Sequence, residues 1–181
     1  MKNIKQWSLF IYGSQEEIMI SPINPAETDE IIEVLYQTFK TIGATRDDLY
    51  GLTPRITNGI SLKATHKGEI VGVYLLKENS INNFIESIES DKIKDFRRSE
   101  TQIFLKEPLS DNGIQGIALA ILPEYRSMGI PGKMIEQIRN MGYDYMWGVQ
   151  DKSLENIEYW KKTRKIFAES PINWATYIKF I

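Results

Sequence analysis

Residues 117–138 read IALAILPEYRSMGIPGKMIEQI, and this stretch decides the fold. An apolar strand from Ile117 to Leu122 leads through Pro-Glu-Tyr-Arg into a glycine-containing turn, and apolar residues at helical spacing follow it. The start of a helix leaves backbone N–H groups unpaired at the positive end of the helix dipole. The stretch therefore predicts a binding site for an anion such as a pyrophosphate.

The spacing of residues in the turn excludes two common nucleotide loops. The P-loop pattern G-x-x-x-x-G-K-[ST] fails because Ser127 stands where its first glycine is needed and Met134 where Ser or Thr is needed. The dinucleotide pattern G-x-G-x-x-G fails at the same serine, since Gly129 and Gly132 supply only its second and third glycines. What remains is the segment 123–131, P-E-Y-R-S-M-G-I-P.

This segment resembles the acetyl-coenzyme A loop of the GNAT superfamily of N-acetyltransferases, whose pattern is [RQ]-x-x-G-x-[GA], often introduced by P-E-Y. The resemblance covers roughly the second half of the chain well and the first half only in layout. It implies an α/β fold in one domain over residues 1–181: a mixed, mostly antiparallel sheet of about six to seven strands with helices on both faces. It also implies transfer of an acetyl group from acetyl-CoA to a primary amine by direct attack in a ternary complex.

The resemblance implies where acetyl-CoA binds. The strand before the loop splays from its neighbour and offers backbone groups of Leu119, Ala120 and Ile121 to the pantetheine arm. Arg126 adds a charge-assisted contact or braces the loop. Proline at position 131, where the family has Gly or Ala, has no N–H but suits the first turn of a helix. The residues expected to hold the pyrophosphate are Ser127, Met128, Gly129, Ile130, Pro131 and Gly132.

The catalytic residues of the family are only partly matched. The tyrosine that acts as the general acid in many members aligns with Trp160, which cannot protonate a thiolate. Tyr159, one residue earlier, is the candidate acid if the helix is shifted. The glutamate that serves some members as the base falls on Gly148, and the sole histidine, His66, is expected as a solvated residue of a hairpin turn. Two alternatives stay open. The protein is an enzyme that works by holding the reactants together or with a base that acts through a water molecule, or it is a catalytically degenerate CoA-binding or regulatory module.

Several further elements are predicted from pattern alone. Asn24-Pro25 indicates a capped helix start, with the segment ending at Gly43. A second short helix is expected over 45–58, interrupted near Thr53-Pro54. The best hairpin signal joins strands at 60–65 and 70–76. Further strands are expected at 7–12, 17–20, 143–149 and 174–180, and a helix at 153–168. That helix carries a basic cluster, expected either as a solvated face or as a contact for the 3′-phosphate of CoA or an acidic acceptor: Lys161, Lys162, Arg164 and Lys165.

An insertion of about 34 residues, 79–112, separates the hairpin from the strand before the loop. Ile81, Phe84, Ile85 and Ile88 predict that part of it is an amphipathic helix. A connection of this length favours a functional role or a packing role. It is expected to be either a lid or acceptor-site element, or a packing or dimer contact.

Composition excludes several classes of protein. The chain has 181 residues, a formal net charge of −2 and no cysteine, which argues against generic nucleic-acid binding and removes thiol catalysis and cysteine-ligated metals. No metal cofactor is expected. No apolar run is long enough to span a membrane, and no signal-peptide pattern is found, so a cytoplasmic protein is expected. The acceptor could be a small-molecule amine or a protein amine, and a homodimer is possible.

Overall fold

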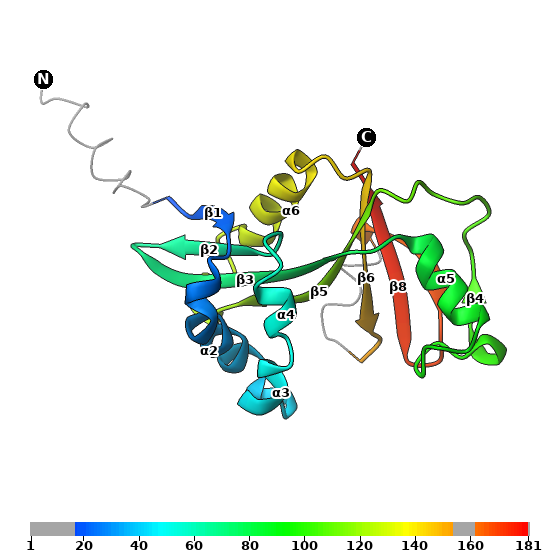
Figure 1. Cartoon of the computed structure of the whole chain (residues 1–181), viewed down its shortest axis with the longest axis horizontal. Coiled ribbons are helices and arrows are strands. Elements are labelled where there is room, and N and C mark those ends of the chain that lie inside the picture. The colour runs from blue at the N-terminus through cyan, green and yellow to red at the C-terminus, as the bar shows by residue number, and fades with distance from the viewer. Residues whose placement is uncertain (1–16, 154–161, 181) are drawn as a thin grey trace, which may run out of the picture.

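The computed structural model describes residues 17–153 and 162–180, which form one eight-stranded sheet with helices on both faces (Figure 1). The strand order is β1-β2-β3-β5-β6-β8-β7-β4, and only β5 and β6 run parallel. The predicted mixed, mostly antiparallel sheet is therefore confirmed, with more strands than the six to seven expected. The strands are β1 (Met19–Pro22), β2 (Leu62–His66), β3 (Glu69–Glu78), β4 (Gln102–Ile103), β5 (Gly113–Ile121), β6 (Tyr145–Asp151), β7 (Lys165–Glu169) and β8 (Asn173–Lys179).

The first helices begin where their caps predict. Asn24 accepts a hydrogen bond from the amide of Ala26, and Glu27 reaches back to the amide of Asn24, so the predicted capping box is confirmed. The 3-10 turn η1 (Pro25–Glu27) then leads into α2 (Thr28–Phe39), and Gly43 ends the segment with a left-handed φ of 89°. The stretch predicted as one interrupted helix forms two short ones, α3 (Arg46–Tyr50) and α4 (Thr53–Ile56).

Helices cover the two faces of the sheet with separate apolar clusters. On one face, α2 packs Ile31 and Leu35 against Val73 of β3. On the other face, α6 (Ile130–Asn140) packs Met134 and Ile138 against β2, β3 and β6. Figure 1 shows α6 and α2 on opposite sides of the long β2–β3 hairpin.

The insertion predicted at 79–112 is observed between the end of β3 and the start of β5. Its amphipathic helix is α5 (Ile81–Glu89), which begins at Ser80, whose hydroxyl accepts from the amide of Asn83. Phe84 packs against Trp147 of β6 and Phe167 of β7, with ring centroids 4.8 and 5.9 Å apart. The two-residue β4 extends the sheet at β7. The insertion therefore packs against the core of the sheet.

One predicted element is wrong in its second half. The helix expected over 153–168 is replaced at Lys165–Glu169 by strand β7, which pairs antiparallel with β8. Phe167 and Ala168 are buried there against the insertion, so pairing and burial override the local pattern. The strand expected at 7–12 and residues 154–161 of that helix lie outside the described residues.

Candidate functional site

The two parallel strands at the centre of the sheet pair over only four residues and then diverge. The ladder joins residues 113–116 of β5 to residues 145–148 of β6, and it ends at the pair Gly116 and Gly148. Beyond this pair β5 continues to Ile121 alongside β3, whereas β6 continues to Asp151 alongside β8. Among the described residues, no strand pairs with the side of β5 that faces β6 beyond this point.

Beyond Gly116 a gap separates β5 from β6. The backbone groups of successive β5 residues point alternately toward β3 and toward this gap. The amide of Leu122 donates to the carbonyl of Val71, so the backbone groups of Ala120 also point toward β3, and those of Leu119 and Ile121 point toward the gap. A bulge in the β3–β5 pairing leaves Ile117 without a ladder partner beside Gly116. Of the three residues expected to meet the pantetheine arm, Leu119 and Ile121 turn their backbone groups toward the gap, whereas Ala120 turns its own toward β3 and its side chain is buried.

Both residues at the point of divergence are glycines, and a side chain on either would meet close neighbours. A Cβ on Gly116 would lie 2.6 Å from the hydroxyl of Tyr74, and a Cβ on Gly148 would lie 3.2 Å from the carbonyl oxygen of Gly116. Tyr74, on β3, is only 5% exposed, and its hydroxyl lies 3.7 Å from Sδ of Met146. The phenol therefore fills the space directly beneath the last pair of the ladder.

Arg164 accompanies this buried tyrosine. Its guanidinium interacts with the Tyr74 phenol, and the residue is only 7% exposed. Burial raises the pKa of the Tyr74 phenol, and the hydrogen bond and charge of Arg164 only partly offset this rise. Arg164 was expected on a solvated basic face, and this expectation is wrong because the chain turns into β7 at the next residue. In the sequence, Tyr74 stands out only as a tyrosine inside an apolar strand and Arg164 only as an arginine among lysines. Neither position indicates that the two side chains meet.

The loop after β5 places free amides at the start of α6. Gly129 adopts a left-handed φ of 70° as the residue before the helix. The amide of Met128 donates to the carbonyl of Tyr125, and Pro131 has no N–H. Within the described residues, the loop amides without an acceptor are those of Ser127, Gly129, Ile130 and Gly132. Four such donors at the positive end of an 11-residue helix suit an anion.

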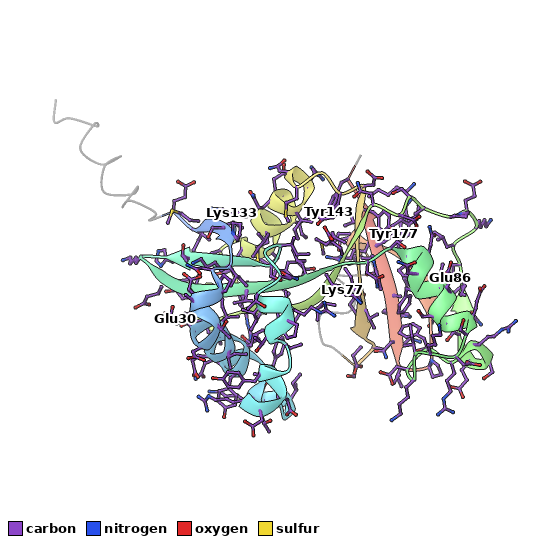
Figure 2. The ribbon with its side chains drawn as sticks, viewed as in Figure 1. Glu30, Lys77, Glu86, Lys133, Tyr143 and Tyr177 are labelled. Atoms are coloured by element: carbon purple, nitrogen blue, oxygen red, sulfur yellow. The ribbon has the colours of Figure 1, made fainter. Side chains whose placement is uncertain are left out.

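Arg126 braces this loop. Its Nε donates to the carbonyl oxygen of Ile121 at 3.4 Å, which ties the loop back to the end of β5. Lys133, labelled in Figure 2, turns toward β1, where its ammonium donates to the carbonyl oxygen of Ile18. His66 is half-buried rather than solvated, with its ring edge-on to Tyr125 at 5.4 Å between centroids. The candidate acid Tyr159 lies outside the described residues.

The fold of this chain is similar to that of solved acetyltransferases. A GNAT family acetyltransferase of Streptococcus agalactiae has a TM-score of 0.65 at 14% identity, over 90% of this chain and 95% of its own. The chain has the GNAT fold. A polyamine N-acetyltransferase of Drosophila melanogaster has a TM-score of 0.60 at 12% identity, over 90% of this chain and 100% of its own. The PaiA N-acetyltransferase of Thermoplasma acidophilum, solved with coenzyme A, has a TM-score of 0.58 at 13% identity, over 90% of this chain and 99% of its own. No protein-family model and no curated protein sequence matches the chain.

On the face of this GNAT fold opposite α6, a cavity of about 440 Å³ opens beside the point of divergence. Its floor takes one side chain from each of four strands: Lys77 of β3, Gln115 of β5, Val149 of β6 and Asn173 of β8. The insertion supplies a wall. The other described lining residues are Asn79, Asn83, Phe84, Ser87, Ile93, Asp95 and Phe96. Gln115 precedes Gly116 and Val149 follows Gly148, so the cavity adjoins the gap between β5 and β6.

Across residues 17–153 and 162–180, no three His, Asp or Glu side chains gather as metal ligands. None of the helices described there has the length and apolar character needed to cross a membrane.

Proposed function

We propose that this protein is an acetyl-CoA-dependent N-acetyltransferase that acetylates a primary amine. The observation that carries the proposal is the divergence of β5 and β6 at Gly116 and Gly148, next to the free amides at the start of α6. The solved relatives with this fold support it, because one is a polyamine N-acetyltransferase and another was solved with coenzyme A.

The residues present fit the donor. The free loop amides would hold the pyrophosphate, with Arg126 bracing the loop, and Pro131 occupies a position in the first turn of α6 where no donor is lost. The backbone groups of Leu119 and Ile121 face the gap, where an extended arm can add to the edge of β5 as a strand would. The open space around the Cβ positions of Gly129 and Gly132 leaves room for phosphates to approach.

The chemistry in this site is direct transfer. The lone pair of the neutral amine attacks the thioester carbonyl carbon, the C–S bond breaks, and the acetyl group stays on nitrogen. The amine gives up one proton, and the departing thiolate takes up one. An amide of β5 that faces the gap stabilises the negative charge that develops on the carbonyl oxygen. Holding the two reactants together supplies much of the lowering of the barrier.

Calorimetry with acetyl-CoA and with CoA tests the proposal, using two matched variants. Gly129→Glu places a carboxylate among the free amides, whereas Gly43→Glu places it at a distant glycine. Both glycines have a left-handed φ and open space around the Cβ position, so the backbone strain is alike. We expect the first variant to lose at least tenfold in affinity and the second to bind as wild type does.

Thiol release across a panel of amines then separates the two open alternatives. Acetyl-CoA-dependent release with at least one amine supports the enzyme. Tight binding of CoA without release for any amine would instead indicate the CoA-binding or regulatory module. If neither ligand binds at micromolar concentration, the proposal fails.

A further inference from the structure

One cation stands in the floor of the cavity beside α5. Lys77 follows Val73 and Leu75 at alternate positions of β3, so its side chain leaves the sheet on the same face as theirs, opposite α6. Figure 2 places Lys77 near the middle of the molecule, between the α2–α4 region and α5. Within the described residues, its ammonium has no carboxylate partner. A half-buried cation without a counter-ion is a natural site for an anionic group of a ligand.

A second donor lies beside this cation. Gln115 is the cross-strand partner of Lys77 on β5, and residues so paired have Cβ atoms about 4.5–5.5 Å apart. The Oε1 of Gln115 already accepts from Asn79 at 3.1 Å, and no described residue accepts from its NH₂ group, which can therefore serve a ligand. An ammonium and an amide NH₂ side by side match the two oxygens of one carboxylate.

The surroundings of the cavity favour an anion over a polycation. Among the described lining residues, Lys77 is the only cation and Asp95 the only carboxylate, and Asp95 is exposed at the rim. The adjoining segment 91–98, DKIKDFRR, holds four basic residues and two acidic ones. A polyamine in this cavity would bring a second positive charge close to Lys77, which raises its free energy of binding.

We propose that this cavity binds the acceptor amine and that the acceptor carries a carboxylate, held by Lys77 and Gln115. The inference rests on the proposed acetyl transfer and names the substrate class: a small amino acid rather than a polyamine. Because the floor adjoins Gly116 and Gly148, an acceptor held by its carboxylate presents its amine toward the gap where the thioester is expected. A volume of about 440 Å³ suits a molecule of this size.

Matched acceptors that differ only in the carboxylate test the proposal. Arginine is paired with agmatine and lysine with cadaverine, and kcat/KM is measured by thiol release from acetyl-CoA. We expect the carboxylate member of at least one pair to be favoured tenfold or more. Lys77→Met should abolish this preference mainly through KM, and Lys77→Arg should keep most of it. Lys106→Met, at an exposed position of the insertion outside the cavity, should leave it unchanged.

A binding measurement separates failure of this inference from failure of acetyl transfer. Calorimetry of each pair with the CoA-loaded protein should show tighter binding of the carboxylate member in wild type and equal binding in Lys77→Met, whether or not turnover occurs. A tripeptide with a free carboxyl end and its amidated form distinguish a protein terminus from a free amino acid. Preference for agmatine and cadaverine, a preference that survives Lys77→Met, or no binding of either member would overturn the proposal.

Discussion

Replacing Gly116 by alanine tests the close packing of Tyr74 beneath the point where β5 and β6 diverge. The new Cβ would lie 2.6 Å from the tyrosine hydroxyl and 2.9 and 3.0 Å from its Cε2 and Cζ, well inside the roughly 3.5–4.0 Å of ordinary carbon contacts. The phenol cannot swing away freely, because Arg164 and Met146 hold its hydroxyl. Forcing a methyl group into such a site typically costs about 1–3 kcal/mol. For a chain of this length, that is a fall in Tm of roughly 2–12 °C.

Urea and thermal unfolding, followed by circular dichroism, give the free energies for a double-mutant cycle. Tyr74→Phe removes the atom nearest the new methyl group, but by itself costs about 1–3 kcal/mol because the buried guanidinium of Arg164 loses a polar neighbour. We therefore expect Gly116→Ala to be less destabilising in the phenylalanine background, with a coupling energy of about 0.5–3 kcal/mol.

Gly132→Ala is the matched control. Its Cβ would have no atom within 4 Å, and its φ does not lie in the left-handed region. Because alanine favours helix over glycine, the free energy of unfolding should stay the same or rise by up to about 1 kcal/mol. Equal stability of Gly116→Ala and wild type, or strictly additive effects in the cycle, would refute the packing argument.

Three further predictions concern stability. Gly129→Ala must hold a left-handed φ of 70° and should lower the free energy of unfolding by about 1–2 kcal/mol in urea titrations. The Lys63 ammonium bonds the Glu27 carboxylate and lowers its pKa, so Lys63→Met should cost about 0.5–1 kcal/mol at pH 7. Because the pKa of Glu27 is lower in the folded than in the unfolded state, the stability difference between wild type and Lys63→Met is lost as pH falls through the lowered pKa. Urea unfolding of both proteins at pH 7 and in acid measures this loss. Burial and the hydrogen bond to Glu78 raise the pKa of Tyr143 to about 12, above its usual value of 10. The contribution of the protonated Tyr143 to the free energy of unfolding is therefore fully present below pH 10 and is lost as pH rises toward 12. In Tyr143→Phe the free energy of unfolding should fall less over this pH range.

Local patterns predicted the elements whose shape depends on neighbouring residues. The capping box at Asn24, the hairpin of β2 and β3, and the helix after the glycine turn are all set within a few residues of chain, and all three are confirmed. The boundaries 79–112 of the insertion are also observed, because both flanking strands are strongly apolar. The ladder end at Gly116 and Gly148 could not be read from either strand alone, since it depends on how two distant segments pair.

The predictions that are wrong concern segments whose structure depends on contacts between residues far apart in the sequence. Residues 165–169, KIFAE, fit a helix or a strand, and the pairing with β8 together with burial of Phe167 selects the strand. Arg164 looks like one more surface cation until Tyr74 is brought beside it from a position 90 residues earlier. The cavity is likewise invisible in sequence, because Lys77, Gln115 and the insertion meet only once the sheet has formed.

The way the insertion is anchored determines how the cavity can act. The amide of Ile81 donates to the hydroxyl of Tyr145, and the indole N–H of Trp147 donates to the carbonyl of Asn79, so the start of α5 is tied to β6 at two points. Phe84 then packs among aromatic rings of the sheet. A lid must open at little cost in free energy, whereas lifting α5 would expose these rings and break both hydrogen bonds. The helix is therefore a fixed wall, and selection among acceptors depends on what fits a site that is already formed.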